Sequence, residues 1–572
     1  MQLKDKMIEI EAELDEKIKH LRIWELPFQT TLSWLLLSID SVGKSKGADT
    51  AIDYCSRLSY IYKIVKQNAA KAQLNSTTNS ILSFDPKYIP DINFLIAYAH
   101  FSLLMPQIRK DVMKAVSSDG KTIHLDYVSQ ATENAEVLDR LYSYISLQAM
   151  VSYPKEEALK DYLVKKATTI DLTLNGADAW WVKDMYEFFR QCLITVEVLP
   201  TKVLEEVLGF SFEDYLSFKA TIRAFGEYYY NLGDAYFTLS QAEKDNPERA
   251  DKLMSEYFEN LVNCFDFKFT GFYVQISGLS KEKVLKLMSY YLSAYSNKTG
   301  ENFVERSFCG EGFYPPFTLF ERHLISSPHA ARYMLTINNI LYSVNKKDTK
   351  TFEQKLSGHL EPTLINQLTY IFRSLPGMDI RKNVNYPGSE IDLLIFSALE
   401  NICLVVQIKA TIAPDSSRTV ERVQDRALEG VQQIKHFRGL NNDEKQEIIN
   451  KSFGIKQTNT HFIDLLVLRS CAGTELIWKH NDDIKITNYT ILAWLISEKI
   501  KNNDFTLAGF DKSIKNYQDE LIRLSNSSKV FETLAIDGYS IKFPNINSDL
   551  TEVIAINFRT YKYLVDFEKS HS

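Results

Sequence analysis

Residues 388–396 read GSEIDLLIF, and residues 402–410 read ICLVVQIKA. Both stretches are short and rich in Ile, Leu and Val, and a polar turn at residues 400–401 separates them, so they predict two consecutive strands. Each strand contains an ionisable residue among apolar neighbours: Asp392 in the first and Lys409 in the second. Burying such groups costs free energy unless they have partners, so this pair of strands is where function is to be sought.

The flanking sequence extends these strands into a mixed α/β unit. A further strand is expected at residues 378–386, and a short apolar run at 462–468 is typical of a buried strand. A helix is expected to begin near Glu361, because Pro362 suits a first helical turn. A second helix is expected over residues 419–437, whose apolar residues fall on one face. The predicted order of this unit is α-β-β-β-α-β.

The rest of the chain differs in character on the two sides of this unit. At 572 residues the chain is too long for one ordinary core. Residues 1–345 show apolar positions at helical spacing, residues 346–480 hold the α/β unit, and residues 481–572 mix helix with a hairpin signal at Asp537-Gly538. We therefore expect a multidomain protein with a mostly α N-terminal half, an α/β domain and a short α+β extension packed on that domain.

Composition and charge limit the class of protein. About 45% hydrophobic and 24% charged residues are typical of a folded protein, and the net charge of −7 does not indicate a strongly basic nucleic-acid binder. The six cysteines form no CxxC pair, which argues against a zinc module. The charged N-terminal sequence lacks the apolar core of a signal peptide, so a cytoplasmic protein without a membrane partner is expected.

The polar residues of the two central strands have the spacing that a cation site needs. Gln407 and Lys409 are two residues apart on one strand, so their side chains project to the same face, which Asp392 can meet from the neighbouring strand. Asp392, the amide oxygen of Gln407 and the carbonyl of Ile408 are hard oxygen ligands of the kind that Mg²⁺ prefers. Lys409 would then orient or deprotonate a water and stabilise developing negative charge.

Asp392 with the triplet Gln407-Ile408-Lys409, on consecutive strands after a helix that bears a glutamate, resembles the PD-(D/E)xK superfamily of restriction-endonuclease-like nucleases. The QxK triplet is similar to the Mrr-like branch, and the resemblance covers about residues 350–470. It implies a restriction-endonuclease-like fold and Mg²⁺-dependent hydrolysis of phosphodiester bonds, with Mn²⁺ as a substitute metal and DNA favoured over RNA. By analogy it also implies a role in restriction or phage defence.

The resemblance also assigns roles to individual residues. Asp392, Gln407, the Ile408 carbonyl and Glu361 would hold the metal, and Lys409 would act as base or charge stabiliser. Two glutamates remain alternatives to Glu361, and two glutamines of the following helix are candidates for a position near the site: Glu353 or Glu390, and Gln432 or Gln433. No proline precedes Asp392, and Gln407 removes a negative charge, which should weaken metal affinity.

The helix after the lysine strand carries a stripe of arginines that could contact phosphates: Arg418, Arg422 and Arg426. Together with Gln433 they are the candidate nucleic-acid-binding residues. Acidic residues alternate with them, so a ladder of surface ion pairs is an equal alternative: Glu421, Asp425 and Glu429.

The helical half is expected to serve recognition, sensing or oligomerisation. Two functions therefore stand side by side. One is a nuclease that acts on nucleic acid. The other is a non-catalytic interaction protein that uses a degenerate nuclease fold as a scaffold and binds a protein partner through its helical half.

Overall fold

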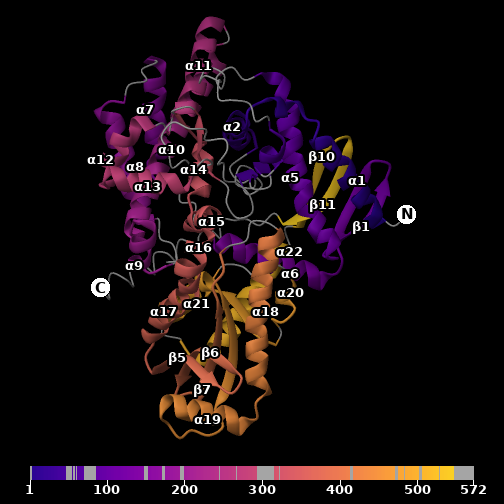
Figure 1. Ribbon diagram of the computed structural model, residues 1–572, viewed down its shortest axis with the longest axis vertical. Helices are drawn as coiled ribbons and strands as arrows, with labels where there is room; N and C mark the ends of the chain where they lie inside the picture. The colour runs from indigo at the N-terminus through magenta and orange to yellow at the C-terminus, as the bar shows by residue number, and fades with distance from the viewer. Residues whose placement is uncertain are drawn as a thin grey trace.

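The computed structural model describes residues 3–46, parts of 54–69, 85–146, 153–169, 174–192, 199–243, 245–263, 265, 267–292, 315–320, 323–412, 417–469, 475–481, 483–501, 505–526 and 529–546. Figure 1 shows a largely helical part above and an α/β part below, built around a five-stranded sheet. The predicted layout of a mostly helical N-terminal half followed by an α/β region is confirmed at this level.

The upper part consists mainly of helices. They are α1 (Leu3–Ile18), α2 (Phe28–Lys46), α5 (Ile89–Arg109), α7 (Glu156–Thr169), α8 (Gly176–Cys192), α9 (Thr201–Val203), α10 (Phe212–Ala242), α11 (Pro247–Asn263), α12 (Thr270–Ser277), α13 (Lys281–Tyr290), α14 (Pro328–Met334) and α15 (Ile337–Lys347). Helix α6 (Gln130–Ser146) comes from the same half of the sequence, but its apolar residues join the core of the lower part. Four strands were not anticipated in this half: β1 (Met113–Asp119), β2 (Thr122–Tyr127), β3 (Thr318–Phe320) and β4 (His323–Ile325).

The long helix α10 organises this part, because its residues are buried on almost every side. It starts at a capping box in which the Ser211 side chain accepts from the amide of Asp214 while the Asp214 carboxylate accepts from the amide of Ser211. Helices α7, α8 and α14 pack against it.

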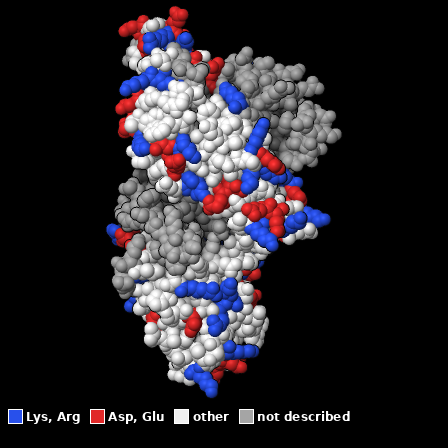
Figure 2. All heavy atoms as spheres, turned by 90° about the vertical axis from the view of Figure 1, so that its left-hand side faces the viewer, with Lys and Arg blue, Asp and Glu red and all other residues white. Residues whose placement is uncertain are grey.

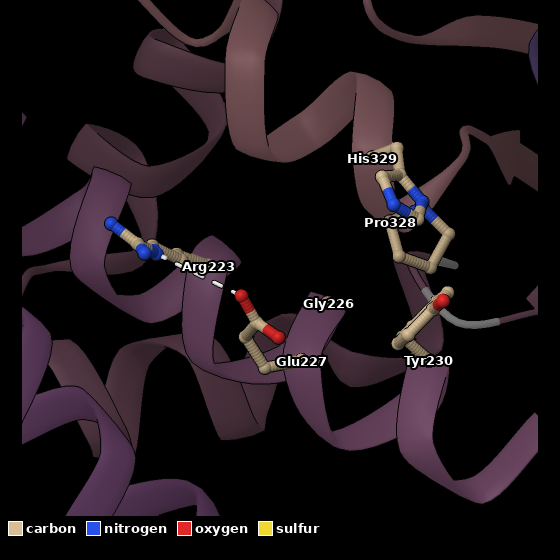
Figure 3. A pocket seen from close by; sticks show the side chains of 6 residues that line it. All are labelled: Arg223, Gly226, Glu227, Tyr230, Pro328 and His329. Carbon is tan, nitrogen blue, oxygen red and sulfur yellow. Dashed lines mark ion pairs between the residues drawn. The ribbon is translucent and has the colours of Figure 1, made fainter. Parts of the chain in front are cut away.

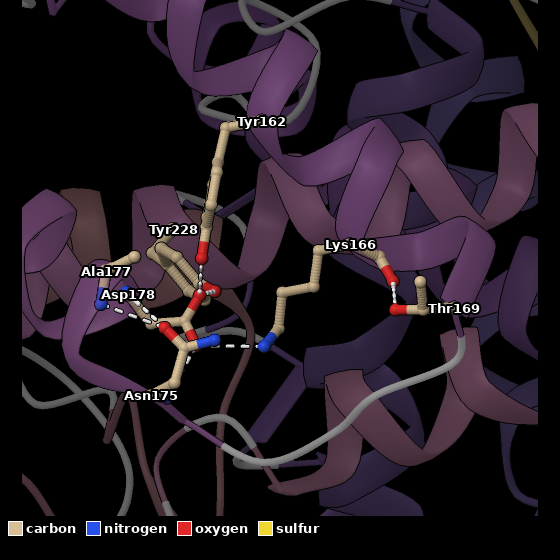
Figure 4. Close-up of polar contacts among 7 residues, drawn as sticks. All are labelled: Tyr162, Lys166, Thr169, Asn175, Ala177, Asp178 and Tyr228. Atoms are coloured by element: carbon tan, nitrogen blue, oxygen red, sulfur yellow. Dashed lines mark hydrogen bonds and ion pairs between the residues drawn. The ribbon is translucent and has the colours of Figure 1, made fainter.

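A buried aspartate links three of these helices (Figure 4). The Asp178 carboxylate of α8 accepts hydrogen bonds from Lys166 of α7 at 2.8 Å, and from Tyr162 of α7 at 2.7 Å. The hydroxyl of Tyr228 on α10 and the amide of Asn175 also donate to it. Burial raises the pKa of Asp178, but these donors outweigh it, so the pKa lies below its ordinary value.

The lower part is a mixed sheet with strand order β5-β6-β7-β8-β9. The predicted strands are β5 (Met378–Tyr386), β6 (Ser389–Ser397), β7 (Ile402–Lys409) and β8 (His461–Leu468), and β9 (Lys485–Asn488) was not anticipated. The first three strands pair antiparallel, whereas β7, β8 and β9 pair parallel. The parallel step from β7 to β8 needs a crossover connection, which α18 and α19 provide.

Helices cover both faces of this sheet. They are α17 (Leu360–Arg373), α18 (Ser417–Gly439), α19 (Asn442–Phe453), α20 (Glu475–Trp478), α21 (Tyr489–Lys501) and α22 (Leu507–Asn526). Leu393 and Ile395 of β6 join a core with α17, α21 and α22, whereas Leu394 and Phe396 join a second core with α19. This alternation is the pattern of a strand buried on both faces. Before α17 lie α16 (Thr349–Thr351), a π-helical turn at Phe352–Leu356 and a 3-10 turn at Ser357–His359.

The C-terminal extension contributes to both parts of the molecule. Helices α21 and α22 pack on the five-stranded sheet, as expected of the extension. The hairpin of β10 (Lys529–Ile536) and β11 (Tyr539–Ile546) turns at the predicted Asp537-Gly538, both with positive φ. However, it does not pack there, because β11 pairs with β2 to complete a sheet of order β1-β2-β11-β10.

The expectation that the whole extension packs on the α/β unit is therefore wrong for this hairpin. The apolar side chains of Ile541 and Phe543 enter the core of the helical part instead. The domain boundaries at residues 345 and 480 stay predictions. Over the described ranges, no helix combines the length and the apolar character needed to cross a membrane.

Candidate active site

The polar residues of β6 and β7 meet where the ladder between these two strands ends. The ladder runs from Ser397 opposite Ile402 to Leu393 opposite Val406. Beyond Leu393 and Val406, hydrogen bonds from side chains connect the two strands instead of backbone pairs. We call this place the β6–β7 fork, and it consists of Glu390, Asp392, Gln407 and Ile408.

Two short hydrogen bonds hold the β6–β7 fork. The amide of Ile408 donates to Oδ2 of Asp392 at 2.6 Å, and Nε2 of Gln407 donates to the carbonyl of Glu390 at 2.6 Å. The amide and carbonyl of a strand residue point to the same side, so the Ile408 carbonyl is directed toward β6 as well. Three oxygen-bearing groups therefore converge here: the Asp392 carboxylate, the Gln407 amide and the Ile408 carbonyl.

The fork is buried and carries an incompletely compensated charge. Asp392, Gln407 and Lys409 are only 7%, 1% and 3% exposed. Burial, with smaller contributions from the carboxylates of Glu361 and Glu390, raises the pKa of Asp392 to about 6, although the Ile408 amide and Lys409 act against the rise. A cation beside Asp392 would favour its ionised form and remove this penalty.

Lys409 lies between two carboxylates from different helices. Its Nζ is 4.0 Å from Oε2 of Glu361, at the start of α17, and 4.0 Å from Oε1 of Glu429 on α18. The predicted companion Glu361 is thus in the same cluster as Asp392 and Lys409. Glu353 is an exposed residue of the π-helical turn, whereas Glu390 lies beside Asp392 in the fork.

Gly430 lets α18 lie directly on the side chain of Lys409. A Cβ at Gly430 would be 3.3 Å from Cγ and 3.4 Å from Cε of Lys409, and 2.7 Å from Cδ1 of Leu466 on β8. Any larger residue would push the lysine or the leucine aside. Sequence reasoning missed Gly430, and the available signal was a glycine inside a strongly amphipathic helix. It named Glu429 as an ion-pair partner on this helix, but did not place it beside Lys409.

The arginines of the α18 stripe have different surroundings. Arg426 is 3.7 Å from Glu361 and also pairs with Glu429, so it belongs to the ion pairs around the fork. Arg422 is exposed, and the side chain of Arg418 lies outside the described residues. Glu421 pairs with Lys110 of the helical part at 3.6 Å, so the structure contains both arginine–carboxylate and lysine–carboxylate pairs along this helix.

The two candidate glutamines of α18 have different surroundings. Gln432 is exposed, whereas Gln433 is half-buried. The side-chain oxygen of Gln433 is buried, and no described residue donates to it. The main-chain carbonyl of Gln433 accepts from the hydroxyl of Tyr386 at 3.4 Å, which holds this turn of α18 next to the end of β5.

The donor set of the fork fits a hard divalent cation. Within the described ranges, no three or more His, Cys, Asp or Glu side chains form a group able to hold a metal. The predicted set is different in kind, because it combines one or two carboxylates with an amide oxygen and a carbonyl. Oε1 of Gln407 is buried, and no described residue donates a hydrogen bond to it. A cation coordinated by this oxygen would supply the partner that the amide oxygen lacks.

A second polar cluster lies in the helical part, in a small hollow between α10 and α14 (Figure 3). Nδ1 of the buried His329 is 2.7 Å from Oδ1 of Asp40 on α2, and Arg223 and Glu227 of α10 form an ion pair at 4.0 Å. The His329–Asp40 contact connects α14 with α2, and the ring of His329 packs edge-on against that of Tyr230 on α10. The hollow is too small for a substrate, and we interpret it as part of the helical core.

Comparison of the chain with models of protein families, with curated proteins and with solved structures gave no match. The geometry of the β6–β7 fork is therefore the basis for assigning a function.

Proposed function

We propose that the chain is a metal-dependent nuclease that hydrolyses phosphodiester bonds of nucleic acid, with DNA as the preferred substrate by resemblance to the PD-(D/E)xK superfamily. One observation carries the proposal. The β6–β7 fork brings the buried carboxylate of Asp392 and the unsatisfied oxygen of Gln407 together, next to the buried ammonium of Lys409.

Each residue of the fork has a role in this proposal. Asp392, Gln407, the Ile408 carbonyl and Glu361 would hold Mg²⁺ or Mn²⁺. The bound metal would supply Lewis-acid activation of a water and neutralise charge on the phosphate. Lys409 would donate from Nζ to the non-bridging phosphate oxygens as negative charge develops, and its burial strengthens that interaction because little water competes.

The test is cleavage of supercoiled plasmid and of a labelled RNA with Mg²⁺ or Mn²⁺. Asp392→Asn and Lys409→Ala should each lower the rate at least about a hundredfold, the scale found when one charge-stabilising group is removed. The matched control is Asp464→Asn, because Asp464 is also a buried aspartate of this sheet but pairs with Arg438 outside the fork. Equal loss in the control, or cleavage that survives both site variants, would remove the proposal.

A non-catalytic scaffold is the second candidate, and the near-complete burial of Lys409 favours it. The carboxylates of Glu361 and Glu429 lie next to Nζ of Lys409, where a phosphate would have to bind if the lysine is to contact it. Wild-type protein that neither cleaves nor binds nucleic acid at low salt would support this candidate. A role in restriction or phage defence, and a partner held by the helical half, remain proposals by analogy.

A further inference from the structure

The outer side of α17 leads away from the fork and carries no negative charge. Asn366, Tyr370 and Arg373 are exposed, and their spacing of four and three residues places them on one side of the helix. Tyr370 is 41% exposed, which is unusual for an aromatic residue of a core-packing helix. The sequence of residues 362–378 contains no Asp or Glu, so the acidic character of the site ends at Glu361.

Strand β5 lies beside the outer side of α17 and adds a further positively charged residue to it. Nζ of the exposed Lys382 donates to Oδ1 of Asn366 at 2.9 Å, which ties the strand to the middle of α17. Lys382 pairs with Leu393, the residue after Asp392, so it stands one strand away from the fork. Among the described residues, neither Arg373 nor Lys382 forms an ion pair with a carboxylate.

These four residues form one surface, which we call the α17–β5 surface: Asn366, Tyr370, Arg373 and Lys382. It differs from the arginine stripe of α18, where Arg426 is held by Glu361 and Glu429. Figure 2 faces the side of the molecule on which α17 lies, and groups of blue Lys and Arg atoms are visible over its lower part beside red Asp and Glu atoms. Arg373 and Lys382 therefore supply positive charge beside the fork that no described carboxylate pairs with.

We propose that the α17–β5 surface binds a single-stranded segment of nucleic acid next to the cleaved bond. Arg373 and Lys382 contact phosphates, and a base stacks on the ring of Tyr370. The two positively charged side chains would fix the position of the nucleic-acid backbone without reading its sequence. The exposed ring of Tyr370 would stack on an unpaired base, whereas a base inside a duplex is not accessible for such stacking. This inference rests on the proposed function, since it names the form of substrate that the same site would accept.

The experiment measures binding rather than cleavage. Fluorescence anisotropy of a labelled 20-nucleotide single strand and of the matching duplex is recorded with full-length protein in Ca²⁺, over a series of salt concentrations. Lys409→Ala is present throughout to prevent cleavage. Wild-type side chains on the α17–β5 surface are compared with the pair Arg373→Gln/Lys382→Gln, and with Tyr370→Ala and Tyr370→Phe.

The variants have defined expected results. Removing both cations should lower the slope of log affinity against log salt by about 1.4, since each phosphate contact contributes about 0.7 for single strands. Tyr370→Ala should weaken single-strand binding about tenfold, and Tyr370→Phe should restore it, because stacking needs the ring and not the hydroxyl. Duplex binding should change less with Tyr370→Ala.

A matched control carries the same loss of charge on another side of the sheet: Lys451→Gln/Lys456→Gln, both exposed. The inference would be overturned if the salt slope changed equally in the control variant, or did not change in Arg373→Gln/Lys382→Gln. Binding of nucleic acid by the wild-type surface would in either case still support the proposed nuclease. Equal effects of Tyr370→Ala on duplex and single strand would overturn the single-strand assignment. Protein with an intact surface that binds neither oligonucleotide at low salt would instead contradict the proposed function.

Discussion

Two buried aspartates, one in each part of the molecule, show opposite ways of burying a carboxylate. Asp178 in the helical part is 0% exposed and accepts from Lys166, Tyr162, Tyr228 and the Asn175 amide, so its pKa is lowered. Asp392 in the fork is 7% exposed and accepts a hydrogen bond from the Ile408 amide, and its pKa is raised to about 6.

The difference separates a carboxylate whose charge the chain compensates from one whose charge it compensates only in part. At Asp178 the donors of three elements neutralise the charge, so nothing more is needed from outside the chain. At Asp392 the neighbouring groups leave part of the cost of burial uncompensated, which is the usual state of a group whose partner is a substrate or metal. The same residue type at similar burial therefore has two different electrostatic environments.

The largest expected effect is on stability at the helical site. Asp178→Asn should lower the free energy of unfolding by about 3–5 kcal/mol, because it leaves the buried ammonium of Lys166 without a counter-charge. Asp392→Asn should instead increase it at neutral pH, since it removes a poorly compensated charge. Chemical denaturation followed by circular dichroism measures both. Equal destabilisation by the two variants would break the comparison.

The pH dependence of stability should differ in sign between the two aspartates. The folded pKa of Asp392, about 6, is above the ordinary value of about 3.9, so the folded state is destabilised progressively as pH rises from about 4 to about 6. The penalty should reach about 2–3 kcal/mol, and Asp392→Asn should therefore gain on wild type over that range. The lowered pKa of Asp178 acts in the opposite direction, because its stabilisation is lost as pH falls below the ordinary value.

Thermal melts of wild type and Asp392→Asn between pH 4 and pH 8 test this sign. A constant difference across the range would mean that Asp392 does not titrate there. With Mg²⁺ at pH 7 the gain of the variant should shrink, because a bound cation stabilises only the carboxylate.

A smaller effect is expected at the glycine beside Lys409. Gly430→Ala should cost about 1–2 kcal/mol, because its Cβ would lie 2.7 Å from Leu466. It should also slow cleavage per folded molecule, since the stem of Lys409 must shift. Gly439→Ala near the end of the same helix is the matched control, because a Cβ there meets nothing within 4 Å. If adding Leu466→Val to Gly430→Ala restores full cleavage, the leucine and not the lysine carries the effect.

Sequence patterns predicted the parts of the fold that depend on local composition. The apolar runs at 391–396 and 402–410 became β6 and β7 because buried strands need such residues on both faces. Strand β9, only four residues of sequence KITN, offered too short a pattern. Helix α19 has few apolar residues, and its capping box at Asn441 and Glu444 was the signal available for it.

The candidate site divides in the same way. Asp392, Gln407 and Lys409 could be placed together because strand pairing follows from spacing, and Glu361 because it starts the preceding helix. The ion pair of Arg426 with Glu361 and the approach of Gly430 to Lys409 depend on how α18 crosses the sheet, which no local pattern specifies. The partners of β2 could not be foreseen either, because β11 lies more than four hundred residues away.

The pairing of β11 with β2 also orders events during synthesis. Strand β2 leaves the ribosome long before β11 is translated. The edge of β2 that pairs with β11 therefore stays unpaired while the strands of the five-stranded sheet are translated and can pair with one another. Contacts so distant in sequence form slowly and leave a strand edge open to wrong partners in the meantime. The sheet of the helical part, although its first strands are translated early, can therefore be completed only after β11 has been made.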